Sequence, residues 1–542
     1  MPDEPGGGAV DPPTVDESDD RRPSRLSGSR LSGSRLSASH PLLFAAYPIL
    51  FLWSQNLGDV DPADVVLPLA LALAAALAAT LLLGLVYGSV ARAALVVTPL
   101  AFGLLMYGHV ATAVAPLHVP GAVQQAGWAG LVLLAAVAAG RWRPSRIAAA
   151  GTLLTRLGAV LVAITLALIV PFQVAGLGRT AATSADSLPT QTSAPKRDVY
   201  WLIFDRYGSD TSEQLMYGVR NDLTPWLRDE GFSVLEGSHA NYVRTALSLG
   251  ATMTMSHLAD MPGVPGPGSG DLTFVNDKIA DSLVARQFKA LGYRYVSIGS
   301  WWAPTQRAPL ADTDLHLGGP SEFVSTLLDE SALPAVQKRL HLAEPVDARV
   351  RHFDNNQFGL AALKDERDDD AGPKFVFAHI LLPHPPLVYD RDGSFMTSQQ
   401  VAGLTDLDRY ERQLAFTNDQ LRQILSGLLS LPPDRQPIII LQGDEGPWPK
   451  AYSANYREPF DWSAMSDDLL EIKFGILNAW YVPGGKDIGL SPTMTSINTF
   501  PTLFANWFGL PYERRDDRVY TSKSWLQPYD LTDVTDRLTP GG

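Results

Sequence analysis

The chain has 542 residues, a formal net charge of −14 and no cysteine. The acidic balance argues against nucleic acid as a partner, because a surface that binds phosphate backbones needs an excess of Lys and Arg. The absence of cysteine excludes disulfides, thiolate metal sites and cysteine nucleophiles. Apolar residues crowd between positions 41 and 177, whereas most acidic residues lie later, so we expect a membrane part followed by a soluble part.

Residues 1–40 contain almost nothing that could form a core. They are rich in Asp, Pro, Gly, Ser and Arg and include the repeat RLSGSRLSGSRLSAS, so we predict a disordered tail. Its basic half directly precedes the first apolar run. Both a solvated charge run and a lipid contact would place this tail at a membrane surface, and we expect that surface to be the cytoplasmic one.

Five apolar stretches follow the tail, and most approach the roughly 20 residues that a helix needs to cross hydrocarbon. They lie at 41–56, 65–88, 92–112, 122–140 and 157–177. The first is short and contains Pro48. We predict five transmembrane helices within 41–177. None carries a buried Asp, Glu or Lys that would mark an ion path, so a transporter is poorly supported. The helices act either as an anchor alone or also in binding a lipid substrate.

The short loops between these stretches differ in charge. The loop after the first stretch holds Asp59, Asp61 and Asp64 without a base, and the loop after the third has no base either. Arg92 follows the second stretch, and four arginines surround the connection between the fourth and fifth: Arg141, Arg143, Arg146 and Arg156. Because cytoplasmic loops retain Lys and Arg, we predict a multi-pass protein of the plasma membrane. Its N-terminus would be cytoplasmic, and everything after residue 177 would be extracytoplasmic.

Residues 178–197 are rich in Ser, Thr, Ala and Pro and read as a linker, and 198–542 as the soluble domain. Short apolar runs in this domain predict buried strands: DVYWLIFD, YRYVSIG, KFVFAH, PIIILQGD and GILNAWYV. Segments such as LTPWLRDEGF and DLDRYERQLAFTNDQLRQILSGLL have helical patterns. Strands that alternate with helices predict an α/β domain with a mostly parallel sheet between helices.

Polar side chains end three of the predicted strands. One apolar run stops at Asp205, the next at His379 with His384 five residues on, and a third at Asp444 and Glu445. Each alone is more often a cap or loop residue. Ligands sit beyond the carboxyl ends of strands in such sheets, so three such ends together favour a site for a divalent cation.

A nucleophile candidate lies in the segment SHANYVRTALSLGATMTMSHL. A strand-like stretch gives way there to a helical pattern at Thr245. A hydroxyl at the start of a helix faces free backbone N–H groups and the positive end of the dipole, where a phosphate can be held. On this segment alone, Thr245 as a simple N-cap is equally consistent.

The order of these features resembles the alkaline phosphatase and sulfatase superfamily. An apolar strand ends in Asp, a Thr begins a helix some forty residues on, and a PHPP segment and a strand ending in GD-x-G follow. With its N-terminal membrane helices, the chain is similar to lipoteichoic acid synthases and phosphoethanolamine transferases. It shares NYxxTxLSL, HILxPHPP and LQGDxGP strings with bacterial sulfatase-like membrane proteins. The resemblance covers about residues 198–510.

This resemblance implies a set of site residues. Asp205, Thr245, Asp444 and Glu445 would surround one metal, with Thr245 as the attacking hydroxyl. His384 would contact the anionic group of the substrate or protonate the leaving oxygen, and His379 would be a second substrate contact. Glu445 stands where the family usually has a His. A carboxylate there favours a hard cation, so we expect one divalent cation, Mn or Mg, with Ca or Zn as alternatives.

The nucleophile segment also separates two chemistries. Sulfatases of this superfamily use a formylglycine made from Cys or Ser in a C/S-x-P-x-R sequence, but this chain reads TALSL. An unmodified Thr instead fits phospho-transfer through a phosphothreonine. We therefore predict a membrane-anchored, metal-dependent phospho-transferase or phosphodiesterase acting on a cell-envelope lipid or glycopolymer. The alternative, prompted by Glu445, is a catalytically inactive sulfatase-like protein of the envelope that binds or scaffolds.

Overall fold

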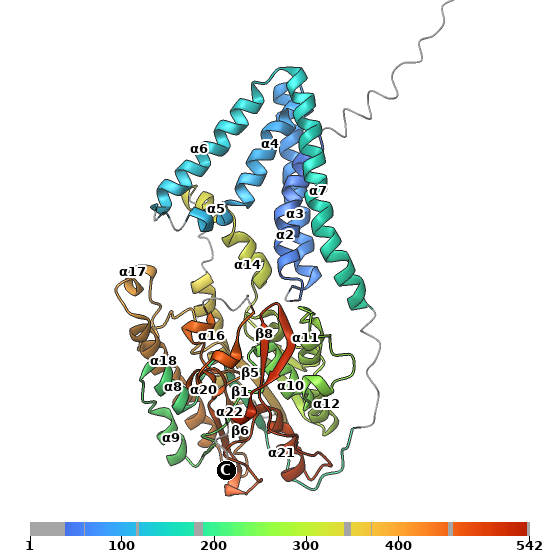
Figure 1. The fold of residues 1–542 in the computed structure, drawn as a ribbon. Coiled ribbons are helices and arrows are strands. Elements are labelled where there is room, and N and C mark those ends of the chain that lie inside the picture. Colours follow the sequence, from blue (N-terminus) through green and yellow to red (C-terminus); the bar gives the residue numbers. More distant parts are fainter. Residues whose placement is uncertain are drawn as a thin grey trace, which may run out of the picture.

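The computed structural model describes residues 38–58, 60–114, 117, 119–177, 188–340, 348–369, 371–453 and 459–538. The predicted tail lies almost wholly outside the described residues, as does the first half of the predicted linker. A bundle of apolar helices occupies one end of the molecule, and an α/β domain the other (Figure 1).

The described residues of the N-terminal region, 38–177 with short gaps, form six apolar helices. They are α2 (His40–Gln55), α3 (Pro62–Tyr87), α4 (Val90–Leu105), α5 (Tyr107–Val114), α6 (Gly121–Gly140) and α7 (Pro144–Leu177). Large apolar side chains point outward from this bundle, and Leu85 in α3 is 82% exposed. Leucines around the whole circumference of a helix are typical of contact with lipid.

Three or four of these helices have the length and composition of a membrane span. The helices α3, α6 and α7 qualify singly, and α4 with α5 qualifies as a pair bent by 58°. With 16 residues, α2 is shorter than the usual span. The stretch at 92–112, predicted as one helix, is thus broken at Met106, and a count of five spans is not confirmed.

The break between α4 and α5 is joined to the α/β domain. The turn between α14 (Glu322–Asp329) and α15 (Leu333–Arg339) supplies both partners. Ala332 N–H donates to the Leu104 carbonyl at 2.7 Å, and Gly108 N–H donates to the Glu330 carbonyl at 2.8 Å. Backbone groups freed by a bend at membrane depth need such partners.

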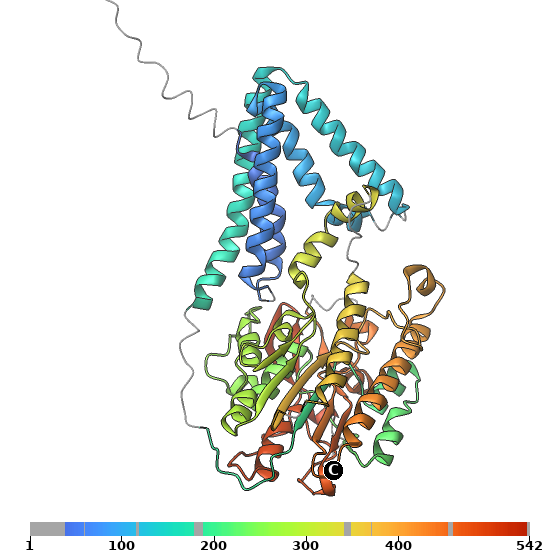
Figure 2. The ribbon, with the colours of Figure 1, turned by 180° about the vertical axis from the view of Figure 1, so that it is seen from behind.

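The helix α14 also packs against the lower ends of α2 and α3. Phe323 and Leu327 form a buried cluster with Ile49, Leu52 and Val65. In Figures 1 and 2 the α14 segment lies in the gap between α2 and α3 on one side and α5 and α6 on the other. The α/β domain therefore contacts the membrane helices through apolar packing as well as through the chain connection.

The α/β domain is built on a seven-stranded sheet with the order β2-β7-β6-β1-β5-β3-β4. The strands are β1 (Val199–Phe204), β2 (Ser233–Val234), β3 (Arg294–Ile298), β4 (Thr313–Leu315), β5 (Lys374–Ile380), β6 (Ile438–Gln442) and β7 (Asn478–Tyr481). The central five strands are parallel, whereas β7 runs antiparallel to β6 and β2 antiparallel to β7. A hairpin of β8 (Tyr520–Ser524) and β9 (Gln527–Asp533) forms a second sheet.

Helices cover both faces of the large sheet. The side chains of β1 alternate, so that Trp201 packs on the face of α10 (Thr245–Thr254), α12 (Leu283–Ala290) and α21 (Thr499–Asn506). Leu202 packs on the face of α9 (Leu223–Asp229), α16 (Ala348–Glu366) and α18 (Asp406–Leu429). All six residues of β1 are buried. Such large apolar side chains contribute about 1.5–3 kcal/mol each when fully buried, so the central strand holds its carboxyl end firmly in place.

Shorter helices complete the domain. They are α8 (Asp210–Tyr217), α11 (Thr273–Ala280), α13 (Ala303–Gln306), α17 (Ser398–Val401), α19 (Lys450–Ser453), α20 (Asp467–Phe474) and α22 (Thr535–Leu538).

Candidate active site

The carboxyl ends of the three central strands bring three predicted residues together. Ile203 of β1 lies opposite both His379 of β5 and Gln442 of β6 in the sheet register. Asp205 and Asp444 follow just after their strands. One ligand atom from each of Asp205, His379 and Asp444 lies within 4.8 Å of the others. We call these three residues the carboxylate-imidazole cluster.

This cluster fits a divalent cation. All three side chains are buried, yet Asp205 Oδ1, His379 Nε2 and Asp444 Oδ2 have no hydrogen-bond partner. Buried polar atoms are nearly always paired, so three unpaired atoms around one point indicate a group that the protein binds there. Two carboxylates and an imidazole suit Mn or Zn at least as well as Mg.

The ring of His379 is held in an orientation that serves such a ligand. Its Nδ1 lies 2.8 Å from the Thr305 hydroxyl and 3.4 Å from the Ser300 hydroxyl. A hydroxyl that accepts from Nδ1–H leaves Nε2 as the free lone pair, which is the usual second contact of a metal-binding histidine. From the sequence we expected His379 as a substrate contact, whereas in the structure it lies in the cluster.

Thr245 lies beside this cluster. It is the first residue of α10, and the N-cap position belongs to Arg244, whose side chain makes no capping bond. Interpreting Thr245 as the N-cap is therefore wrong. Its side chain instead lies near the Asp444 carboxylate, where it acts to lower the pKa of that group. The half-buried Thr245 thus lies close to a carboxylate 199 positions later in the chain.

A cavity of about 310 Å³ opens over Thr245. It is lined by residues of the α/β domain, among them Asp205, Arg206, Thr245, Trp301, Trp302, His384, Glu445, Trp448 and Trp525. Asn56, directly after α2, also lines it. The cavity therefore lies where the α/β domain meets the end of the membrane helices.

His384 reaches the same cavity from the HILLPHPP loop. Its Nδ1 bonds to the Pro385 carbonyl, and because a carbonyl only accepts, Nδ1 carries the proton. Burial and the Arg206 guanidinium lower the pKa of His384 to about 4. The imidazole is therefore neutral at pH 7, and its Nε2 is a proton acceptor.

Glu445 lies next to Asp444 but has different partners. Its Oε1 accepts from Arg206 Nε at 3.0 Å and from the Trp448 indole at 2.8 Å. Its Oε2 accepts from Lys473 Nζ at 2.7 Å. Both oxygens are therefore engaged, whereas Asp205 and Asp444 each leave one oxygen without a hydrogen-bond partner. We call Arg206, Glu445 and Lys473 the ion-pair cluster.

The acidic groups perturb one another. Burial, together with the charges of Asp205 and Glu445, raises the pKa of Asp444 well above its usual value. Burial also acts to raise the pKa of Asp205, but His384, His379 and Arg206 hold it below its usual value. Burial lowers the pKa of Lys473, against the effect of Glu445. Excess negative charge at this depth is what a bound cation would offset.

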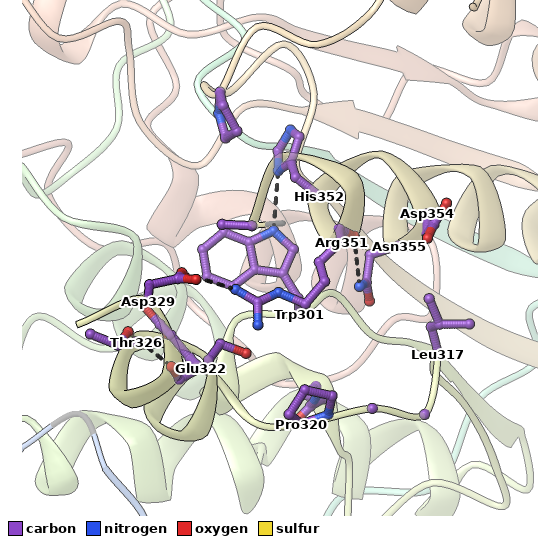
Figure 3. Close-up of a pocket in the computed structure, with 16 residues that line it drawn as sticks. Trp301, Leu317, Pro320, Glu322, Thr326, Asp329, Arg351, His352, Asp354 and Asn355 are labelled. Carbon is purple, nitrogen blue, oxygen red and sulfur yellow. Dashed lines mark hydrogen bonds and ion pairs between the residues drawn. The ribbon is translucent and has the colours of Figure 1, made fainter. Parts of the chain in front are cut away.

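A second cavity of about 440 Å³ adjoins the first and shares Trp301 and Glu322 with it. Figure 3 shows the Trp301 indole pointing at His352, to whose Nδ1 it donates at 3.1 Å. Burial lowers the pKa of His352 to about 3, so this ring is a neutral acceptor. No sequence pattern pointed to His352, which lies within the helix α16.

Sequence reasoning also missed Arg206 and Lys473. Arg206 directly follows Asp205 at the predicted strand end. That position indicated a site residue, but only acidic residues and histidines were considered as ligands. Lys473 lies in α20, where EIKF reads as the charged face of an ordinary helix. Nothing in that pattern indicates a fully buried lysine.

Neither a scan of protein-family models nor a search of curated proteins found a match. Similar solved structures include the C-terminal periplasmic domain of EcEptC from Escherichia coli in a complex with Zn. It is 11% identical, with 64% of this chain and 96% of that chain covered and a TM-score of 0.39.

Two further solved structures widen the comparison. The integral membrane protein lipooligosaccharide phosphoethanolamine transferase A from Neisseria meningitidis is 12% identical (88% of this chain, 95% of that chain, TM-score 0.37). A phosphonate monoester hydrolase of Agrobacterium radiobacter is 14% identical (60% and 80%, TM-score 0.36). The structural neighbours belong to the alkaline phosphatase and sulfatase superfamily.

Proposed function

We propose that this chain is a membrane-anchored phospho-transferase or phosphodiesterase that uses Thr245 as its nucleophile and one divalent cation. The observation that carries the proposal is the position of the Thr245 side chain near Asp444, beside a cluster in which one buried atom of each member lacks a hydrogen-bond partner. Hydroxyl, carboxylates and imidazole meet in a cavity that a phosphate ester can enter.

Asp205, His379 and Asp444 would hold the cation, and Thr245 would lie beside it. When bound, the cation supplies positive charge that stabilises phosphoryl oxygens and eases ionisation of the hydroxyl. The Thr245 oxygen attacks phosphorus and gives its proton to the nearby Asp444 carboxylate. The bond to the leaving oxygen breaks, that oxygen takes a proton from water and departs as the alcohol, and the phosphoryl group is carried on Thr245.

His384 has the second role in this proposal. An alcohol or water then attacks the phosphothreonine, and the neutral Nε2 of His384 takes its proton. The bond between phosphorus and the Thr245 oxygen breaks, and that oxygen regains its proton from Asp444. Because the pKa of His384 is lowered to about 4, a base role fits neutral pH better than the proton-donor role expected from the resemblance. Transfer to an alcohol and hydrolysis by water share this step, so the site is compatible with both.

We further propose five crossings, with α2 as the additional one, and an extracytoplasmic domain over 198–542. The loop at Gly58 touches the α/β domain at Leu272, while Tyr87 and Gly140 meet one another at the far end of the bundle (Figure 1). The arginines after Gly140 therefore cluster away from the α/β domain. Arginine-rich loops stay in the cytoplasm, which supports an outward domain.

A lipid or envelope glycopolymer is the substrate class that this geometry favours. Asn56, at the end of a membrane helix, lines the same cavity as Thr245, so a substrate held in the membrane surface would have a short path to the nucleophile. The alternative of an inactive binding protein rested on Glu445. His379 would supply a third ligand without Glu445, so the carboxylate at position 445 is compatible with an active site.

The test uses the full-length protein in detergent, loaded in turn with Mn, Zn and Mg. We expect release of nitrophenol from bis-nitrophenyl phosphate, and a loss of about 10³-fold or more in Thr245→Ala, because covalent catalysis loses its nucleophile. Thr254→Ala is the matched control, since that hydroxyl lies in the same helix and bonds the Gly250 and Ala251 carbonyls and the Met261 sulfur, away from the cluster. Equal rates for wild type and Thr245→Ala with every metal would discard the nucleophile.

A further inference from the structure

The residue after Asp205 enters the cavity with an unusual backbone. Arg206 has a φ of 58°, a left-handed conformation that non-glycine residues rarely adopt. Its N–H donates to Asp444 Oδ1 at 3.0 Å, which fixes it against the carboxylate-imidazole cluster. Strained backbone of this kind is kept where the surrounding structure holds it, and it gathers at functional sites.

The guanidinium of Arg206 is held from two sides. Its Nε donates to Glu445, and its plane lies 3.8 Å from the centre of the Trp448 ring. The indole of Trp448 donates to the same Glu445 oxygen. Stacking and the ion pair together fix the plane of the guanidinium, so little side-chain freedom is left to lose when it binds a ligand.

The far end of this guanidinium has no protein partner. The bond to Glu445 uses Nε, and among the described residues no hydrogen bond from Nη1 or Nη2 is present, while the side chain is only 16% exposed. Arg206 lines the cavity with Thr245 and His384. Two parallel N–H donors on a planar fork match two oxygens of a phosphate group.

Glu445 in turn is fixed by Lys473. Both side chains are almost fully buried, and the Glu445 carboxylate sits between two cations. A carboxylate that already neutralises two cations has little to offer a metal ion. Lys473 neutralises part of the negative charge of Glu445. Because of this, Arg206 presents a net positive charge to the cavity.

We propose that Arg206 is the anion-binding residue of this cavity, taking two oxygens of a phosphate or phosphodiester group, and that Glu445 holds Arg206 rather than the cation. The inference deepens the proposed function and rests on it for the identity of the substrate. Glu445, which stands where the family usually has a histidine, then has the role of positioning Arg206. Its presence there is compatible with an intact cation site.

Two measurements on full-length protein in detergent test it, and neither needs turnover. The first is bound Mn per chain by elemental analysis, and the second is the affinity for inorganic phosphate by titration calorimetry on Mn-loaded protein. We expect Arg206→Gln to keep Mn but to bind phosphate about tenfold more weakly or worse, because it loses charge-assisted hydrogen bonds. Arg206→Lys retains the positive charge but lacks the two parallel N–H donors. Its phosphate affinity should therefore lie between those of wild type and Arg206→Gln.

Glu445→Gln discriminates the two roles of the carboxylate. We expect it to keep its Mn and to lose phosphate affinity by several-fold. The double variant Glu445→Gln, Lys473→Met removes the buried charge together with its partner and serves if the single variant is unstable. Arg294→Gln is the matched control, since Arg294 also bonds two carboxylates, Glu366 and Asp369, and does not line the cavity.

Loss of Mn in Glu445→Gln or in the double variant, with the fold intact by melting curve, would overturn the proposal, as would unchanged phosphate affinity in Arg206→Gln. Wild-type protein that binds no phosphate would also overturn it. Failure of the proposed function looks different: phosphate binding would still depend on Arg206, while Thr245→Ala would change no rate.

Discussion

Two polar clusters lie side by side at the carboxyl edge of the sheet, and they share neighbours in the chain. Asp205 and Asp444 belong to the carboxylate-imidazole cluster, while the next residues, Arg206 and Glu445, belong to the ion-pair cluster. Both clusters are buried, yet the first leaves three polar atoms unpaired and the second leaves both Glu445 oxygens paired. Burial alone therefore does not mark a ligand site; unpaired atoms that converge on one point do.

The largest effect should come from the unpaired cluster. Asp444→Asn removes a proposed ligand and the carboxylate that lies near Thr245, so we expect bound cation and phosphodiester hydrolysis both to fall to background. Elemental analysis and nitrophenol release measure the two. The exposed Asp468 provides the control variant Asp468→Asn. Full metal content in Asp444→Asn would show that the cation binds elsewhere.

Breaking the paired cluster should instead cost stability. Lys473→Met leaves the Glu445 carboxylate buried with only Arg206 as a cationic partner, and loss of one partner of a buried pair costs about 3–5 kcal/mol. We expect a lower melting temperature at unchanged Mn content. A variant that keeps its melting temperature but loses its Mn would mean that the two clusters are not separate.

Glu213 is a third kind of buried carboxylate to set beside the two clusters. Among the described residues it forms no ion pair, and it belongs to neither cluster. It accepts from the Tyr410 hydroxyl and from Gly208 N–H, and burial raises its pKa from 4.5 to about 7. The folded state then keeps a proton that the unfolded state loses above pH 4.5. Stability from this group is full below pH 4.5 and is lost as the pH rises through about 7, by about 3 kcal/mol.

Glu213→Gln removes that dependence. We expect its free energy of unfolding, relative to wild type, to rise from pH 5 to pH 8, as followed by melting curves at constant ionic strength. The exposed Glu411 gives the control Glu411→Gln. Parallel curves for wild type and Glu213→Gln would mean that the carboxyl ionises normally.

The smallest expected effect concerns the contact behind His379. Thr305→Val removes the hydroxyl that meets Nδ1, and such outer partners change metal affinity by about tenfold or somewhat more. Competition with a chelator measures this shift. An unchanged affinity would leave the ring orientation to packing alone.

Much of the α/β fold could be predicted because its strands are buried on both faces. The runs that became β1, β3, β5 and β6 are almost wholly apolar. The run that became β7 was recognised, but an apolar run carries no direction, so its antiparallel pairing with β6 was not predictable. The break at Met106 depends on Glu330 and Ala332, which lie over 200 residues further on.

The site was predictable as a set of strand ends but not as two clusters. Pattern reasoning located Asp205, His379 and Asp444, since each ends an apolar run. It could not assign Asp444 to one cluster and Glu445 to the other. Both residues lie beyond Gln442, the last residue of β6, where the regular alternation of side chains between the two faces of the sheet no longer holds. The partner that decides, Lys473, comes from a helix with no distinguishing pattern.

The turn between α14 and α15 completes the backbone of the broken membrane helix. The chain near residue 190 joins the apolar helices covalently to the α/β domain. The hydrogen bonds of the peptide groups at Leu104 and Gly108 form a second, noncovalent connection. A protease that nicks the chain just before β1 should therefore not release the α/β domain, and the halves should travel together through gel filtration. The apolar helices and the α/β domain therefore act as one unit with a fixed relative orientation.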